Sequence, residues 1–272
     1  MPRWEVLGLL LFGAVLVALY VRHALRTEYP IIDLSLLKVP TFRTSVTGGS
    51  LFRIGVGAVP LLLPLMLQLG FGMSPLRSGL TTFVAAIGAM AMKATAAPIL
   101  DAIGFRRVLV LNGVIGAVFI AANSQFSPAT PIVLILAVLL VGGYFRSLEF
   151  TCINAIAYAD IDNGRMSRAV SFAAVAQQLS LSVGVAFGAG VVQVLHARHG
   201  GALSLSDFHW AFVAVAGVSA TAVVAFARLP ADAGASLASR PAVRTATGAQ
   251  GEIKINEATA RGAEPRPGSA MG

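Results

Sequence analysis

Charged side chains are scarce in this chain of 272 residues, at 12% of the total, whereas soluble domains carry about 25%. Cysteine is scarcer still, because Cys152 is the only one. One cysteine excludes an internal disulfide and a metal site built from several cysteines. In an apolar run such a residue is expected to pack as a small hydrophobic side chain.

The motifs of the common catalytic sites are also missing from the sequence. The four histidines show no metal-ligand spacing, since His196 and His199 lie in a predicted loop and His23 and His209 stand apart. No glycine loop followed by Lys-Ser/Thr is present, which excludes direct use of ATP. Serine, histidine and carboxylate do not gather in any one region. We therefore expect neither an enzyme nor a bound metal or cofactor.

Apolar residues dominate instead, at 56% of the chain with a mean hydropathy of +0.79. A soluble fold of this length cannot bury so much apolar surface, so lipid must cover part of it. A helix needs about 20 apolar residues to cross a bilayer. We predict an all-α polytopic membrane protein with about seven transmembrane helices, because these runs lack the alternation of a membrane barrel. The predicted spans are 5–23, 46–69, 78–98, 106–123, 131–156, 169–194 and 209–228.

The same pattern predicts four regions. Residues 1–23 form a retained transmembrane helix, with a cleaved signal as the alternative, although no small-x-small cleavage site follows the run. Residues 24–45 form a cytoplasmic linker, either an amphipathic surface element or a plain loop. Residues 46–228 form a six-helix bundle. Residues 229–272 contain no aromatic residue and are predicted to be a disordered cytoplasmic tail.

The net charge of +8 raises nucleic acid as a partner, but the basic residues are scattered through short loops, so we reject it. They follow the positive-inside rule instead, with nine on one side and three on the other. This places the N-terminus outside and the C-terminus in the cytoplasm of a bacterial-type inner membrane. The inner set is Arg22, Arg26, Lys38, Arg43, Arg106, Arg107, Arg165, Arg168 and Arg228; the outer set is Arg3, Arg77 and Arg198.

Four charged side chains lie within the predicted spans: Arg53, Lys93, Arg146 and Glu149. A charge at the bilayer centre costs about 2.5–3.5 kcal/mol on insertion scales, so it usually marks a cavity, a partner charge or a substrate path. Arg146 and Glu149 are three residues apart and share a helix face. They form either a private ion pair or a cavity-facing pair that binds substrate or moves a proton. Glu149 is the sole carboxylate well inside a span and hence the candidate proton carrier.

The two remaining charges have less demanding explanations. Arg53 either extends to the inner surface of the membrane or pairs with Glu149 across helices. Lys93, near the end of its span, is expected to extend to the surface. Asn112 and Asn154 are expected to hydrogen-bond between helices.

Glycine and proline also carry predictions. Pro60 and Pro64 should bend the second span. Gly184 and Gly188, four apart, permit close helix contact, either as ordinary packing or as a dimer interface. Asp101, Gly104, Arg106 and Arg107 form a tight cytoplasmic turn between the third and fourth spans, in which the glycine permits the reversal.

Several stretches together resemble the C-terminal half of the major facilitator superfamily, specifically the fourteen-helix drug:proton antiporters of the EmrB/QacA type. The likeness covers about residues 5–228, and the loop at Asp101 departs from the family pattern at Ala97 and Ala102. The stretches that carry it are 42–43, 50–55, 63–68, 72–79, 101–107, 142–149, 158–160 and 166–178.

The resemblance implies that the first span is a linker helix and that the other six form the C-terminal bundle. Its first and fourth helices, which carry Arg53, Arg146 and Glu149, would line the central cavity. It further implies proton-coupled export of small amphipathic compounds or drugs, with the proton gradient as energy source. No N-terminal bundle is present in the sequence, and one bundle cannot alternate alone. The alternative is a non-transporting subunit or a truncated fragment that needs an N-terminal half-transporter chain.

Overall fold

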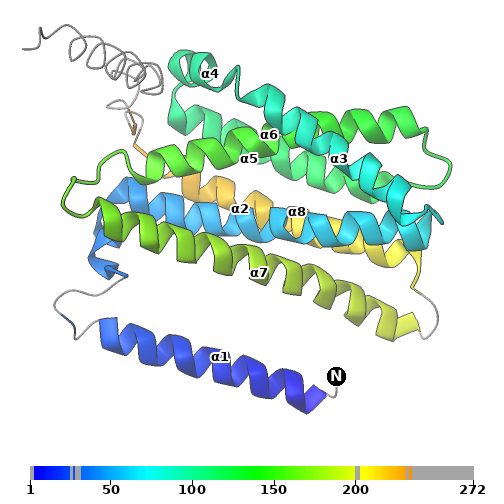
Figure 1. The fold of residues 1–272 in the computed structure, drawn as a ribbon, viewed down its shortest axis with the longest axis horizontal. Helices are drawn as coiled ribbons and strands as arrows, with labels where there is room; N and C mark the ends of the chain where they lie inside the picture. Colours follow the sequence, from blue (N-terminus) through cyan, green and yellow to red (C-terminus); the bar gives the residue numbers. More distant parts are fainter. Residues whose placement is uncertain (1–2, 25–26, 28–31, 200–202, 231–232, 235–272) are drawn as a thin grey trace, which may run out of the picture. The chain divides into compact units, whose positions relative to one another are not determined.

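A computed structural model describes residues 3–24, 27, 32–199, 203–230 and 233–234. These residues form helices and connecting turns without a strand, as predicted (Figure 1). The predicted disordered tail lies outside the described residues from residue 235 onward. The helices are α1 (Arg3–Ala24), η1 (Leu34–Lys38), α2 (Pro40–Leu65), η2 (Met66–Gly70), α3 (Pro75–Met92), α4 (Ala96–Ile103), α5 (Phe105–Ala122), η3 (Asn123–Gln125), α6 (Ile132–Ala157), α7 (Met166–His199) and α8 (Leu205–Ala227).

Five helices in the described part of the chain are long and apolar enough to cross a membrane, or six if the bent pair α3 and α4 counts as one span. They correspond to the second through seventh predicted spans. The first predicted span corresponds to α1, a helix of 22 residues. The all-α membrane fold is therefore confirmed.

The second span begins at Pro40 rather than at residue 46, so the predicted linker 24–45 ends sooner than expected. Proline is favoured in the first turn of a helix because its missing amide is not needed there. The preceding residues are not a plain loop, since η1 is a short 3₁₀ turn capped by Asp33, whose carboxylate accepts the Ser35 amide at 2.9 Å. Past Pro64, α2 widens into the π-turn η2.

The third span is broken, whereas the sequence predicted a continuous helix over 78–98. Its parts α3 and α4 meet at an angle of 61°. Pro98 explains the break, because in a continuous helix its ring would clash with the carbonyl of Ala94. The Thr95 hydroxyl also bonds the Met92 carbonyl at 3.1 Å and contacts the Tyr144 hydroxyl at 2.6 Å. Lys93 is exposed in the turn between the two parts.

Small residues bring two pairs of helices into backbone contact. A Cβ added to Gly88 of α3 would overlap the carbonyl of Leu140 on α6, and one added to Gly143 of α6 would overlap that of Ala85 on α3. Likewise, a Cβ on Gly184 of α7 would overlap the carbonyl of Ile54 on α2. The glycines of α7 therefore serve packing within the bundle, the first of the two predicted roles.

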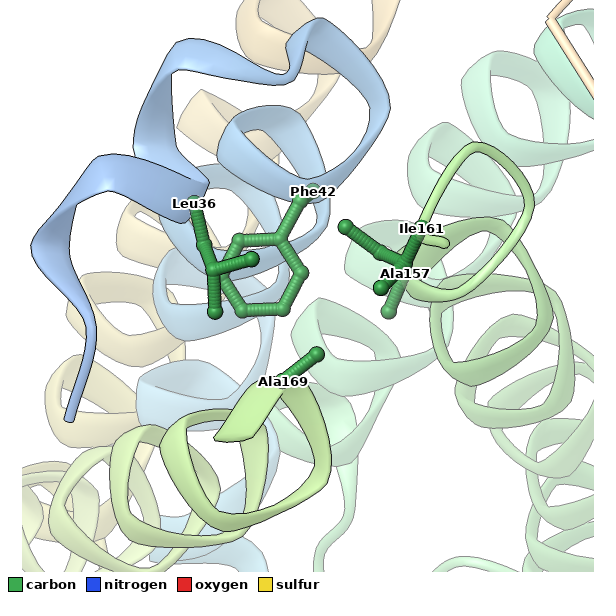
Figure 2. Close-up of a cluster of buried hydrophobic side chains, with 5 residues drawn as sticks. All are labelled: Leu36, Phe42, Ala157, Ile161 and Ala169. Carbon is green, nitrogen blue, oxygen red and sulfur yellow. The ribbon is translucent and has the colours of Figure 1, made fainter. Parts of the chain in front are cut away.

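The start of α2 and the connection between α6 and α7 are joined by a hydrophobic cluster (Figure 2). Polar contacts reinforce it. The Thr41 hydroxyl donates to Asp160 at 2.9 Å, and Arg168 forms an ion pair with Asp33 at 3.4 Å. This joins residues more than a hundred positions apart at what we call the Phe42 end of the bundle. The cluster comprises Leu36, Phe42, Ala157, Ile161 and Ala169.

Candidate functional site

Glu149 lies on α6 and is fully buried. Its Oε2 accepts a hydrogen bond of 2.8 Å from Nδ2 of Asn112 on α5, and the same amide nitrogen donates to the Phe145 carbonyl at 2.8 Å. Oε1 of Glu149 has no hydrogen-bond partner among the described residues. Gly113 of α5 lies beside Oε1, since a Cβ added there would be in ordinary contact with this atom at 3.6 Å. The carboxyl group therefore faces α5 and is held there by a single neutral amide.

Arg53 on α2 is also buried, with 3% of its surface exposed. Its Nη2 donates to Oδ1 of Asn154 on α6 at 2.8 Å, and its guanidinium lies 5.6 Å from the centre of the Phe150 ring. The sequence left open an ion pair with Glu149 or extension to the surface. Neither is found, because an amide and an aromatic ring on α6 hold the guanidinium inside the bundle.

Arg146 lines a cavity of about 260 Å³ between α2, α3, α5 and α6. In the part of the chain that the structure describes, it forms no ion pair with Glu149, although the two are one turn apart on α6. The private ion pair is thus the wrong alternative. Arg146 is the one charged group among the described residues of the cavity wall, which include Phe52, Pro60, Thr82, Phe119 and Asn123.

The three predicted pathway residues therefore occupy three separate environments rather than one cluster. Sequence spacing alone could place Arg146 and Glu149 on one helix, but it could not show that Glu149 turns toward α5 and Arg146 toward α2 and α3. Asn112 and Asn154 were predicted to form hydrogen bonds between helices. In the structure Asn112 donates to Glu149, and Asn154 accepts from Arg53. Asn123, a further buried amide in the cavity wall, was missed because it lies at the very end of its predicted span.

The predicted turn motif is centred on Gly104, which lies between α4 and α5. Its φ of 82° ends α4 and lets the chain reverse before α5. Arg106 donates from Nη2 to the carbonyl of Ala227 at 2.9 Å and so joins the start of α5 to the end of α8. Asp101 and Arg107 are exposed. Only Gly104 and Arg106 therefore have a structural role that can be read from the geometry.

No group of three His, Cys, Asp or Glu side chains that could hold a metal ion occurs among the described residues. The buried polar groups instead pair across helices, and Cys152 is a buried free thiol.

A bundle of apolar helices with buried charges and an internal cavity is typical of membrane transporters. The sequence profile of the Major Facilitator Superfamily matches residues 6–185 and 45–261. The chain therefore belongs to this superfamily of transporters, which confirms the resemblance and its fold.

The chain is similar to the "Putative multidrug resistance protein MdtD" of Salmonella heidelberg, of Salmonella paratyphi A and of Salmonella typhimurium. In each case it is 30% identical over 232 residues, which are 84% of this chain and 49% of the relative. The chain thus spans about half the length of the relatives it matches.

Proposed function

We propose that this chain forms the C-terminal bundle of a secondary transporter that exports small amphipathic compounds in exchange for protons. The superfamily match and the multidrug resistance relatives support transport as the activity and amphipathic compounds as the cargo. No catalytic role is assigned to any residue. The energy source is the proton gradient.

Glu149 is the proton carrier, and its environment is the observation that carries this proposal. Two acidic side chains are buried in span-length helices of the described bundle, Glu149 and Asp207. Asp207 lies in the first turn of α8 and accepts the Ser204 amide there, whereas Glu149 lies well inside α6. A neutral carboxylic acid can stay in this apolar interior with Asn112 as its partner, whereas a carboxylate there lacks a counter-charge. Loss of the proton therefore favours a state in which α5 and α6 open the site to water. That coupling between protonation and helix position is what an antiporter needs.

Alternating access in this superfamily requires two bundles that rock about a midplane site. The relatives are about twice as long as the matched region. The bundle therefore works against a second six-helix bundle, and an N-terminal half-transporter chain is the partner that supplies it if the two are separate. The second candidate function is a subunit without transport activity of its own. The chain matches only about half of each relative, and this favours such a role. Co-purification with such a partner would separate the two candidates.

The transporter lies in a bacterial-type inner membrane with its N-terminus outside and its C-terminus in the cytoplasm. The nine-to-three distribution of basic residues supports this orientation. Three contacts support the same orientation, because each joins segments that the prediction places on the cytoplasmic side. They are Thr41–Asp160, Asp33–Arg168 and Arg106–Ala227.

The test is uptake of a fluorescent amphipathic dye into everted membrane vesicles with an imposed pH gradient. Glu149→Gln keeps the shape and the Asn112 contact but cannot release a proton, so we expect gradient-driven uptake to fall at least about tenfold while dye binding persists. Asp162→Asn is the matched control, because Asp162 is exposed and its pair with Arg165 is a surface ion pair. Full uptake by Glu149→Gln would refute the proton-carrier role.

A further inference from the structure

The cavity beside Arg146 carries a positive charge, which the proposed export of amphipathic compounds does not by itself require. Arg146 is the one charged residue of its described wall, and the other two buried charged residues of α2 and α6, Arg53 and Glu149, are not part of that wall. Glu149 is held against Asn112 on α5. Arg53 is held by Asn154 and Phe150. An arginine guanidinium remains protonated in proteins, so the cavity keeps a net positive charge without a carboxylate in its wall.

The remaining wall is mostly aliphatic, with two aromatic side chains, Phe52 and Phe119, and two neutral polar ones, Thr82 and Asn123. Phe52 is fully buried, and Phe119 stacks on Phe145 with ring centres 5.9 Å apart. Asn123 is 5% exposed; its amide nitrogen bonds the carbonyls of Phe119 and Ile120, while its Oδ1 has no partner among the described residues. The cavity therefore offers one cation, aromatic side chains and one free acceptor.

We propose that this cavity binds a small aromatic anion, with its carboxylate on Arg146 and its ring between Phe52 and Phe119. A lipophilic cation is disfavoured, because it would leave Arg146 without a partner and add a second positive charge beside it. A hydroxyl or amino group on the ring would donate to Oδ1 of Asn123. The volume of about 260 Å³ lies below the roughly 300–1,000 Å³ of common ligand pockets, which limits the ligand to one or two rings. This inference rests on the proposed function and names its substrate class.

The test is equilibrium binding to the purified full chain in detergent micelles, with three probes of nearly equal shape. These are 2-naphthoate, its neutral amide and 2-naphthylmethylammonium. We expect wild-type protein to bind the naphthoate at least about tenfold more tightly than the ammonium. Arg146→Gln should weaken naphthoate binding by roughly 10- to 100-fold, because it removes a charge-assisted hydrogen bond, and should leave the amide nearly unaffected.

Three further variants locate the effect. Arg77→Gln removes the same charge from an exposed position and should leave all three affinities unchanged. Arg146→Lys keeps the charge and should keep the preference for the anion. Thr82→Phe fills the cavity and should weaken the acid and the amide together. The reactivity of the buried thiol of Cys152 reports whether each variant is folded.

Equal or tighter binding of the ammonium by wild-type protein would overturn the proposal, as would unchanged naphthoate affinity in Arg146→Gln. Failure of the site and failure of the transport function are distinguishable. Selective naphthoate binding without uptake under a pH gradient contradicts transport and leaves the site intact. Gradient-driven uptake of a cationic dye without any preference for the anion contradicts the site and leaves transport intact.

Discussion

At the scale of single residues, the buried polar groups are organised by asparagine side chains rather than by ion pairs. Asn112 donates to Glu149, and Asn154 accepts from Arg53, so each contact joins two helices. These amide contacts stand where the sequence suggested ion pairs. A neutral amide binds a carboxyl group whether or not the group carries a proton. An arginine in its place would favour the carboxylate. The choice of amide therefore suits a group that must gain and lose a proton.

The Asn112–Glu149 contact should be measurable as a coupling. Asn112→Leu leaves the Glu149 carboxyl group without a donor, and we expect it to lower the free energy of unfolding by roughly 1–2 kcal/mol. The double variant Asn112→Leu/Glu149→Leu should recover part of this loss, because two apolar side chains need no partner. The measurement is thermal unfolding in detergent, followed with a thiol-reactive coumarin that labels Cys152 on exposure. Asn163→Leu, at an exposed loop position, is the control. Strictly additive effects in the double variant would contradict the coupling.

At the scale of elements, the linker before α2 is fixed to the bundle through η1. Leu36 and Phe42 are fully buried in the cluster of Figure 2. The Ser35 side chain and amide, together with Arg168, hold the pKa of Asp33 below its ordinary value despite partial burial. A carboxyl group with a lowered pKa in the folded state stabilises the fold above its unfolded pKa of about 4, and this contribution is lost as the pH falls through the folded pKa.

The Asp33 contact therefore predicts a pH-dependent difference in stability. Asn retains much of the capping ability of Asp but lacks its charge, so Asp33→Asn isolates the ionic part. We expect it to lower the free energy of unfolding at pH 7 by roughly 0.5–1 kcal/mol, the size of a partly exposed ion pair. The difference from wild type should begin to shrink as the pH falls below about 4 and should vanish below the lowered folded-state pKa, where Asp33 is protonated in both states. Thermal unfolding at pH 7 and pH 3 measures it, and a difference independent of pH would show that the charge is not the cause.

At the scale of the whole molecule, the proposed orientation can be tested with cysteine labelling. Cys152 is buried, so the chain offers a low background. Ala129→Cys lies in the exposed connection before α6. Asn163→Cys lies in the exposed connection after α6, and so at the opposite end of this helix. We expect a membrane-impermeant maleimide to label Ala129→Cys on intact cells and Asn163→Cys only after permeabilisation. The reversed pattern would contradict an external N-terminus. The unsubstituted chain serves as the control.

The amino-acid sequence by itself determined which segments form membrane-crossing helices and which helix ends lie on the same side of the bundle. Hydropathy fixes these features locally, because each apolar helix satisfies its own backbone in lipid whatever its neighbours do. The glycines of α7 were interpreted correctly on the same basis, since their packing acts over short distances along the chain. The orientation deduced from the basic residues stays a prediction. The break at Pro98 was also encoded locally, but the long apolar run around it concealed the break.

Only the tertiary structure decided where Arg53, Arg146 and Glu149 are directed. Helical periodicity places Arg146 and Glu149 on one side of α6, yet three residues correspond to a rotation of about 300°, so the two side chains diverge by some 60°. Which neighbour each one meets depends on how closely the helices approach. Gly143 against Ala85 sets the approach of α6 to α3, because a Cβ there would overlap the Ala85 carbonyl. The Asn112 amide on α5 fixes the direction of the Glu149 carboxyl group. Pairing between helices is therefore a property of their packing, which no single stretch of sequence contains.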